Sequence, residues 1–212
     1  MQGCSGGQAD GGGGGRDGRS TAEETETLPP ETREEGEAQV ATPTAGATAL
    51  IRTSKGDVEV EFYPEDAPET VKSFLKLAED GFYDGIRFHR VEPGFVVQGG
   101  DPLTKGLSAA EVRAVIERQR TRTMRPQDPA LGTGGPGFNV RAEFNSRKHV
   151  TGTLAMARSE SPDSAGSQFY ICLGPQPFLD GNYTVFGQVT SGMDVVESIE
   201  IGDSIGTIDV RE

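Results

Sequence analysis

Residues 88–101 read Phe88-His89-Arg90-Val91-Glu92-Pro93-Gly94-Phe95-Val96-Val97-Gln98-Gly99-Gly100-Asp101. Apolar residues gather on both sides of Pro93-Gly94, and we predict short strands over residues 87–91 and 95–98. The same stretch holds one histidine, one arginine and one glutamine, which is an unusual density of polar side chains beside apolar runs.

The sequence before this stretch predicts a hairpin followed by a helix. Valine and phenylalanine alternate with glutamate over residues 58–62, and Ser54-Lys55-Gly56-Asp57 connects this run to the preceding Leu50–Thr53 run. A period of two indicates a hairpin with one face in solvent. Pro68 suits the first turn of a helix and Gly81 suits its C-terminal cap. The apolar face of that helix would consist of Val71, Phe74, Leu75 and Ala78.

The sequence after the stretch predicts further short strands and one more helix. The strands are expected at Thr153–Ala157, Gln168–Leu173, Val185–Val189 and Thr207–Val210, and the helix at Met193–Ile199. Many short strands with glycine-rich turns and two helices favour a mainly β protein, a barrel or a sandwich, over a βαβ architecture.

Residues 103–131 differ from the rest of the chain. Ser108-Ala109-Ala110-Glu111 is a capping box, which predicts the start of a helix. Helical spacing continues through Val112, Val115, Ile116 and Gln119. Six basic and three acidic residues give this segment a net charge of +3 in a chain of −13. We interpret it as a surface helix with a solvated basic face.

Residues 1–49 are rich in glycine, glutamate and proline and almost free of large apolar residues, so we predict a disordered acidic tail or tether. Residues 50–212 are then enough for one domain. The sequence as written predicts a cytoplasmic protein. The alternative is an extracytoplasmic lipoprotein anchored through Cys4, because Gly3-Cys4-Ser5 resembles a lipoprotein cleavage site that would need a signal region upstream.

Composition excludes several classes of function. With 20 basic against 33 acidic residues, non-specific binding to nucleic acid or to an anionic membrane is not expected. No apolar run is long enough to predict a membrane-spanning helix. The two cysteines, Cys4 and Cys172, do not suffice for a disulfide framework or a cysteine zinc site.

Two short motifs fail on their context. Residues 132–137 satisfy G-x-G-x-x-G but lack the surrounding βαβ unit, and residues 202–206 satisfy G-x-S-x-G with no histidine after the serine. Both are interpreted as turns or loops. His89 and His149 have no partners at metal-ligand spacing, so we interpret them as structural residues and predict no metal.

Residues 88–101 resemble the signature of the cyclophilin family of peptidyl-prolyl cis/trans isomerases. The match recurs, in family order, in Gly152-Thr153-Leu154-Ala155-Met156-Ala157-Arg158, in Gly166-Ser167-Gln168-Phe169-Tyr170-Ile171, and in the block from Phe178 to Gly187. The resemblance implies a closed eight-stranded antiparallel β-barrel capped by two helices. Relative to the family, residues 103–131 are a helical insertion.

The reaction of this family suits a chain without a nucleophile, cofactor or metal. Rotation about an X-Pro bond breaks no bond but loses amide resonance, at a barrier of about 18–20 kcal/mol. A catalyst needs a fixed donor near the prolyl nitrogen and an apolar pocket with little water.

The resemblance assigns the site residue by residue. Arg90 is the donor to the prolyl nitrogen, Gln98 supports Arg90 and the substrate carbonyl, and Phe95 completes the catalytic group. Phe95, Val96, Tyr170 and Leu179 form the proline pocket, Ala157, Arg158 and Gln168 line the peptide groove, and Phe178 and Tyr183 stand at its rim. Phe169 is expected on the opposite side of its strand.

Four positions depart from the common family pattern. Phe178 replaces a tryptophan, Tyr183 a histidine, Arg158 an asparagine and Val96 a methionine. Loss of the tryptophan implies that cyclosporin binds weakly. We expect a monomer that acts on proline-containing peptides and folding proteins, with the insertion extending the groove and favouring acidic peptides. The alternative function is a non-catalytic module that binds proline segments as a chaperone or scaffold.

Overall fold

A computed structural model describes residues 46–211. The predicted tail up to residue 45 and the predicted lipid modification of Cys4 lie outside the described residues. The first strand begins at Thr48, two residues before the predicted start of the domain at Leu50.

Eight strands form one sheet in the order β3-β4-β6-β5-β7-β2-β1-β8, and every pairing is antiparallel. Its strands are β1 (Thr48–Thr53), β2 (Gly56–Phe62), β3 (Arg90–Glu92), β4 (Val96–Gly99), β5 (Thr153–Met156), β6 (Phe169–Cys172), β7 (Val185–Ser191) and β8 (Ile205–Arg211). The predicted fold class, mainly β, is confirmed, and each predicted strand is present within a few residues of its expected bounds.

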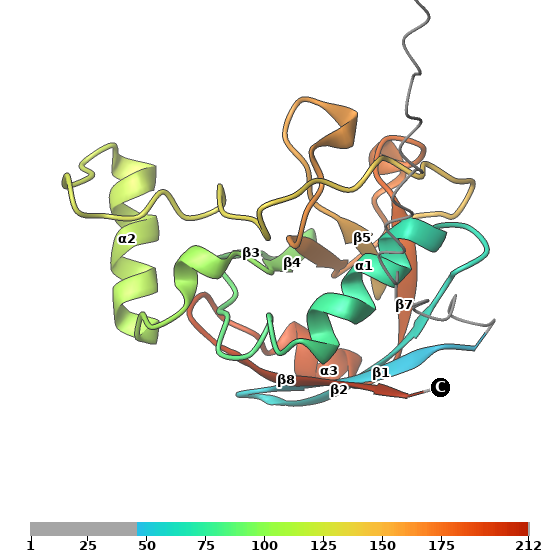
Figure 1. Cartoon of the computed structure of the whole chain (residues 1–212). Helices are drawn as coiled ribbons and strands as arrows, with labels where there is room; N and C mark the ends of the chain where they lie inside the picture. Colours follow the sequence, from blue (N-terminus) through green and yellow to red (C-terminus); the bar gives the residue numbers. More distant parts are fainter. Residues whose placement is uncertain (1–45, 212) are drawn as a thin grey trace, which may run out of the picture. The chain divides into compact units, whose positions relative to one another are not determined.

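The sheet curls, and its two edges are β3 and β8 (Figure 1). The predicted closed barrel would need a strand ladder between β3 and β8. In the described part of the chain these two edge strands form no ladder, so what is observed is an open, curled sheet. Four backbone hydrogen bonds do join residues 85–88 to residues 202–205, at 2.8–2.9 Å. The predicted strand 87–91 is therefore wrong in extent, because its first two residues pair with the segment 202–205. Bonding to β4 begins at the His89 N–H, which donates to the Gln98 carbonyl at 3.2 Å, and the β3 ladder itself starts at Arg90.

In the part of the chain that the structure describes, three α-helices accompany the sheet: α1 (Pro68–Glu79), α2 (Ala109–Thr121) and α3 (Met193–Glu197). Three short 3-10 helices lie at Pro102–Thr104, Pro162–Ser164 and Pro177–Leu179. Pro68 occupies the first turn of α1, as predicted. Gly81 follows the helix with a φ of 66°, a conformation that glycine adopts without strain.

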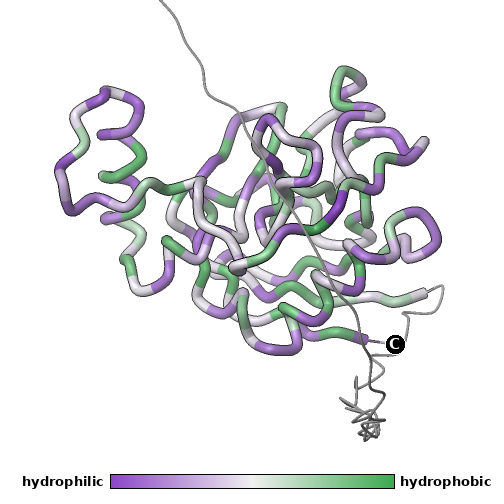
Figure 2. Tube along the Cα trace, turned by 45° about the horizontal axis from the view of Figure 1, so that its top comes forward, coloured by the Kyte–Doolittle hydropathy of each residue, from purple (hydrophilic) through white to green (hydrophobic). Residues whose placement is uncertain are grey.

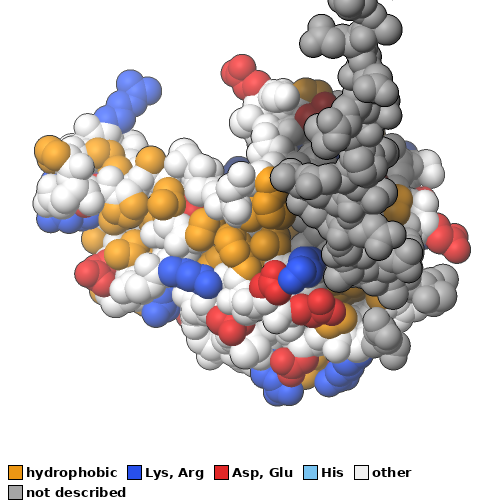
Figure 3. All heavy atoms as spheres, viewed as in Figure 1, with side chains coloured by type: hydrophobic (Ala, Val, Ile, Leu, Met, Phe, Trp, Pro, Cys, Tyr) orange, Lys and Arg blue, Asp and Glu red, His pale blue; other side chains and the backbone are white. Residues whose placement is uncertain are grey.

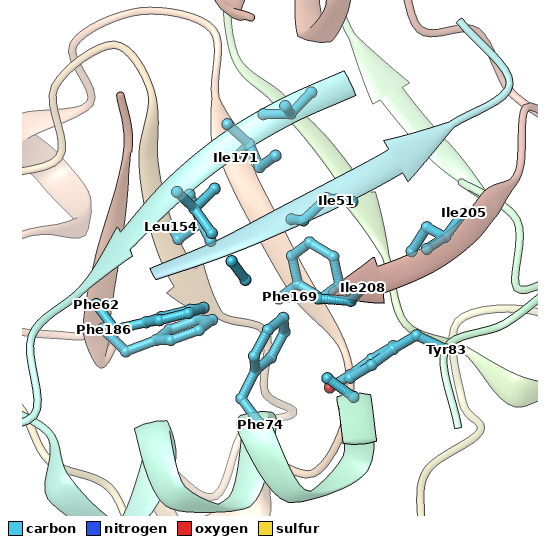
Figure 4. Close-up of a cluster of buried hydrophobic side chains, with 14 of the residues drawn as sticks. Ile51, Phe62, Phe74, Tyr83, Leu154, Phe169, Ile171, Phe186, Ile205 and Ile208 are labelled. Atoms are coloured by element: carbon cyan, nitrogen blue, oxygen red, sulfur yellow. The ribbon is translucent and has the colours of Figure 1, made fainter. Parts of the chain in front are cut away.

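The main core lies between α1 and one face of the sheet (Figure 4). Phe74 of α1 meets Phe169 of β6 edge to face, with ring centroids 5.4 Å apart. Phe62 and Phe186 stack at 6.1 Å. Phe169 thus faces the core, which confirms the side of the strand that was predicted for it.

The insertion forms α2 and a small core of its own. Val112, Val115 and Leu131 are buried together there. The predicted capping box is present, since Ser108 accepts from the Glu111 N–H and Glu111 accepts from the Ser108 N–H. Figure 1 shows α2 standing to one side of the sheet, and Figure 2 shows hydrophobic and hydrophilic residues alternating along it.

Asp101 joins the two ends of the insertion. Its carboxylate is fully buried and accepts from the N–H of Leu103 at 2.8 Å and from the N–H of Gly132. Leu103 is the first residue of the segment 103–131 and Gly132 directly follows its last, so one side chain ties the two ends of the insertion together. Gly134 lies against the same carboxylate, where any larger side chain would collide with it.

Candidate active site

Strand alternation separates the site from the core. In the β4–β6 pair, Val97 and Ile171 point into the main core, whereas Val96 and Tyr170 belong to a second apolar cluster on the opposite face. Successive side chains of a strand point to opposite faces. The residues expected to bind substrate therefore gather on the outer surface of the curled sheet.

Four side chains form one row across that outer surface. Arg90 of β3 is paired with Gln98 of β4, Gln98 with Tyr170 of β6, and Tyr170 with Ala155 of β5. Residues that are far apart in the chain become neighbours because the register of three antiparallel pairs aligns them.

A pocket of about 190 Å³ lies over this row. Nine of the eleven predicted site residues line it: Arg90, Phe95, Val96, Gln98, Ala157, Arg158, Tyr170, Leu179 and Tyr183. Val96, Tyr170 and Leu179 are buried, so the floor of the pocket is apolar and shielded from water. We refer to it as the proline pocket, after the ligand that the family resemblance implies for it.

The two remaining predicted residues lie next to this pocket. Gln168 lines an adjoining depression of about 340 Å³, accepts a hydrogen bond from Gln98 Nε2 at 3.1 Å and donates one to the Gly134 carbonyl at 2.8 Å. Phe178 is 65 % exposed and stacks on Phe95, with ring centroids 5.8 Å apart. Phe178 therefore stands at the rim, as expected.

Arg90 presents a free guanidinium to the proline pocket. Its Cζ lies 5.3 Å from the centroid of the Phe95 ring, and its Nε lies 3.9 Å from the Glu92 carboxylate. Within residues 46–211 its side chain makes no hydrogen bond, so the donors of the fork remain available to a ligand.

Arg158 is held differently from Arg90. Its guanidinium donates to the carbonyls of Ser159, Glu160 and Asn182 at 2.9–3.1 Å. It also lies 4.8 Å from the centroid of the Tyr183 ring. Most of its donors are already used within the protein, which suits a wall of the groove better than a catalytic donor.

A buried chain of hydrogen bonds supports Tyr170 from behind. The Tyr170 hydroxyl lies 3.0 Å from Nε2 of His149, and Nδ1 of His149 lies 3.0 Å from the Asp180 carboxylate. This arrangement assigns the ring proton to Nδ1 and makes Nε2 the acceptor of the tyrosine hydroxyl. The interpretation of His149 as structural is confirmed, but its link to the pocket was not predicted, because no local pattern connects residues 149, 170 and 180.

Burial also keeps two side chains at the floor of the pocket, Tyr170 and Cys172, in their protonated forms. The pKa of Tyr170 is raised well above its usual range, and the pKa of the Cys172 thiol is raised to about 12, in both cases chiefly by burial. Both side chains are neutral at pH 7, so neither is a nucleophile or a base under these conditions.

His89, the neighbour of Arg90 in the signature, is buried, and burial lowers its pKa although Asp101 nearby opposes the shift. Neither ring nitrogen makes a hydrogen bond within the described residues. Gln168 and the Arg87 backbone lie close to the ring without hydrogen-bond geometry. His89 is thus a buried neutral imidazole with no hydrogen-bond partner among the described residues.

Both short motifs that failed on context form loops and strand ends. Residues 132–135 line the depression beside Gln168, and the stretch 202–206 contains the start of β8. Within residues 46–211 no cluster of histidine, cysteine, aspartate and glutamate could hold a metal ion. Among the same residues, no helix is both long and apolar enough to cross a membrane.

Comparison with known proteins agrees with this site. The profile of the family described as cyclophilin type peptidyl-prolyl cis-trans isomerase/CLD matches residues 48–211. A peptidyl-prolyl cis-trans isomerase of Synechococcus elongatus is 40% identical over 164 residues, which cover 76% of this chain and 94% of that protein. Peptidyl-prolyl cis-trans isomerase B of Bacillus subtilis is 42% identical over 156 residues, covering 73% of this chain and 90% of that protein.

Solved structures show the same fold. The crystal structure of a cyclophilin type isomerase of Cryptosporidium parvum superposes with a TM-score of 0.62 at 25% identity, covering 79% of this chain and 98% of that one. A structure of the same protein in the presence of the dipeptide Ala-Pro gives a TM-score of 0.61 at 26% identity, covering 78% and 99%.

An antiparallel sheet that carries an apolar pocket and a free arginine on its outer face, together with these matches, defines a cyclophilin fold. The chain belongs to the cyclophilin type peptidyl-prolyl cis-trans isomerase family. Its activity is the cis/trans isomerisation of peptidyl-prolyl bonds.

Proposed function

We propose that the proline pocket holds the proline ring of the substrate and that Arg90 stabilises the twisted amide. As the X-Pro bond rotates, the prolyl nitrogen loses resonance and becomes pyramidal and basic. A guanidinium that stays charged and donates toward that nitrogen stabilises this state more than the planar ground state. No bond is broken and no proton needs to leave the enzyme.

The single observation that carries this proposal is the free guanidinium of Arg90 beside an apolar pocket. Gln98, which lies opposite Arg90 in the β3–β4 register, would hold the substrate carbonyl while Gln168 orients its amide. Phe95, Val96, Tyr170 and Leu179 would enclose the ring. Ala157, Arg158 and Tyr183 would line the groove, with Phe178 at its rim.

The substrates that we propose are proline-containing peptides and folding proteins. The apolar floor of the pocket fits a proline ring, and a structural relative was crystallised in the presence of Ala-Pro. We also propose that the protein acts as a single chain, that residues 1–49 form a tail to the domain 50–212, and that cyclosporin binds weakly, since Phe178 has no ring N–H to donate.

The test of the catalytic role is a comparison of Arg90→Ala with Arg141→Ala. Arg141 is exposed and lines none of the pockets described, so it matches the loss of charge without touching the site. We expect kcat/KM for an Ala-Pro peptide, measured by NMR exchange, to fall roughly 10- to 1000-fold in Arg90→Ala, on the scale of removing one preorganised donor. A full rate in Arg90→Ala would contradict the mechanism.

We propose further that the sheet closes into a barrel. The support is the set of backbone hydrogen bonds between residues 85–88 and 202–205, which join the segment before β3 to the start of β8. Closure at this point would brace the strand that carries Arg90 against the opposite edge of the sheet.

A further inference from the structure

A second pocket of about 480 Å³ lies beside the proline pocket, and α2 forms one of its walls. Ile116, Gln119 and Arg120 line it from α2, and Arg90 and Gln98 line it from β3 and β4. Arg90 and Gln98 line both pockets, so the two pockets share these side chains as a common wall. We call this second pocket the α2 pocket. Figure 3 shows hydrophobic side chains that extend from the α2 side onto the adjoining body.

Two arginines and one glutamate set the charge of the α2 pocket. The Glu92 carboxylate lies 3.6 Å from an amino nitrogen of Arg120 and 3.9 Å from Nε of Arg90. Neither distance is that of a hydrogen bond, and within residues 46–211 the Arg120 side chain makes none. The lining therefore carries one excess positive charge, with most donors of both guanidinium groups free.

The walls of the α2 pocket also hold unpaired polar atoms. Four buried side-chain nitrogen or oxygen atoms in the described part of the chain have no hydrogen-bond partner. Three of them belong to residues of this lining: Nδ1 and Nε2 of His89 and Oε1 of Gln119. The Gln119 amide is fixed in direction because its Nε2 donates to the Leu131 carbonyl at 3.0 Å. Unsatisfied buried polar groups are rare in native proteins, and here they gather in the wall of one pocket.

We propose that the α2 pocket is an accessory substrate site that selects peptides with an acidic side chain near the isomerised proline, and that Arg120 determines this specificity. The position of Glu92 shows that a carboxylate fits beside both guanidinium groups. A substrate carboxylate would bind the free edge of the Arg120 fork, in competition with Glu92. The proposal rests on the function proposed for the proline pocket, because the peptide must be held there first.

The experiment measures kcat/KM for matched peptides in which glutamate or glutamine occupies each of the three positions on either side of Ala-Pro. The ratio of the glutamate to the glutamine value, at its best position, reports acidic selectivity and cancels any change in the common chemical step. Three variants are compared with the wild type: Arg120→Gln, Glu92→Gln and Arg122→Gln. Arg122 ends α2, is exposed and lines neither pocket, so it controls for the charge of the helix.

We expect the wild type to prefer glutamate by about 3- to 10-fold and Arg120→Gln to lose that preference. Glu92→Gln should raise it, since the competing carboxylate is gone, and Arg122→Gln should leave it unchanged. An unchanged ratio in Arg120→Gln, or equal losses in Arg120→Gln and Arg122→Gln, would overturn the proposal. So would an unchanged or lower ratio in Glu92→Gln.

Measuring Arg90→Ala on the same peptides separates this proposal from the proposed function. If Arg90→Ala lowers the rate on the glutamine peptides while Arg120→Gln leaves the ratio unchanged, the catalytic role of Arg90 stands and the accessory site is wrong. If Arg90→Ala keeps the full rate, the function proposed for the proline pocket fails on its own evidence.

Discussion

Tyr170 contributes its ring to the proline pocket and its hydroxyl to the support behind it. The ring is buried among the apolar residues of the outer face, and the hydroxyl is bound to His149, which Asp180 holds in turn. A buried imidazole with both nitrogens paired keeps one orientation. The floor of the pocket therefore depends on a carboxylate, that of Asp180, which does not line the pocket itself.

At the residue scale we predict a pH effect through Asp180. Hydrogen bonds from the backbone N–H and the ring of His149 lower its pKa from 3.8 to about 2. Between these values the unfolded chain binds more protons than the folded one, so the free energy of unfolding rises with pH. This contribution is complete above about pH 4 and is lost as the pH falls through 2.

Urea unfolding at several pH values between 2 and 5 measures this effect. Asp180→Asn should show a shallower rise of the free energy of unfolding than the wild type, because the titrating group is gone. Asp84→Asn is the control, since Asp84 is exposed and makes no ion pair with another described residue. Equal slopes in the Asp180→Asn variant and the wild type would contradict the prediction.

At the scale of elements, α2 is attached to the domain through a small core and through Asp101. The small core holds three buried residues of the insertion, Val112, Val115 and Leu131, far fewer than the main core, and it reaches the domain through the partly buried Ile201. An ion pair between Arg118, in the last turn of α2, and Asp128, at 2.6 Å, holds the end of the helix against the segment that follows it. The position of α2 beside Arg90 therefore depends strongly on how its two ends are held.

We predict that Asp101→Ala destabilises the domain by about 2–4 kcal/mol, because the N–H groups of Leu103 and Gly132 lose their acceptor and an unpaired buried donor costs roughly 1–3 kcal/mol. Urea unfolding at pH 7 measures the loss, and Asp84→Ala is the exposed control. A loss below about 1 kcal/mol would show that Asp101 does not hold the base of the insertion.

At the scale of the whole molecule, the curled sheet separates two apolar environments. The inner face packs against α1 to form the main core, and the outer face carries the proline pocket. The sheet edge at β3 bears Arg90, so the rigidity of that edge decides how well the guanidinium is held. Backbone hydrogen bonds between residues 85–88 and residues 202–205 hold the segment that leads into this edge strand.

We predict that this pairing is as stable as the interior of the sheet. Four amides donate the hydrogen bonds between residues 85–88 and 202–205: those of Gly85, Phe88, Gly202 and Ile205. Their hydrogens should exchange with solvent as slowly as those of the β1–β2 ladder. Hydrogen exchange followed by NMR measures this, with exposed Gly137 as the fast reference. Rates near that of Gly137 would argue against a closed barrel.

Local patterns were sufficient for most elements. The alternation over 58–62 predicted β2, the apolar spacing after Pro68 predicted α1, and Ser108-Ala109-Ala110-Glu111 predicted the start of α2. Each of these signals depends on residues within a turn or a strand of one another. The bounds of β3 could not be predicted in this way, because residues 85–88 form backbone hydrogen bonds with residues 202–205, more than a hundred positions away in the chain.

The sequence by itself determined the strands, the helices and, through its resemblance to a family, the residues of the proline pocket. Only the tertiary structure decided that His149 and Asp180 support Tyr170, that Asp101 closes the insertion, and that Arg120 lies beside Glu92 and Arg90. The physical reason is the same in each case. Such contacts join side chains from separate elements, and their distance depends on strand register and helix packing rather than on any local pattern.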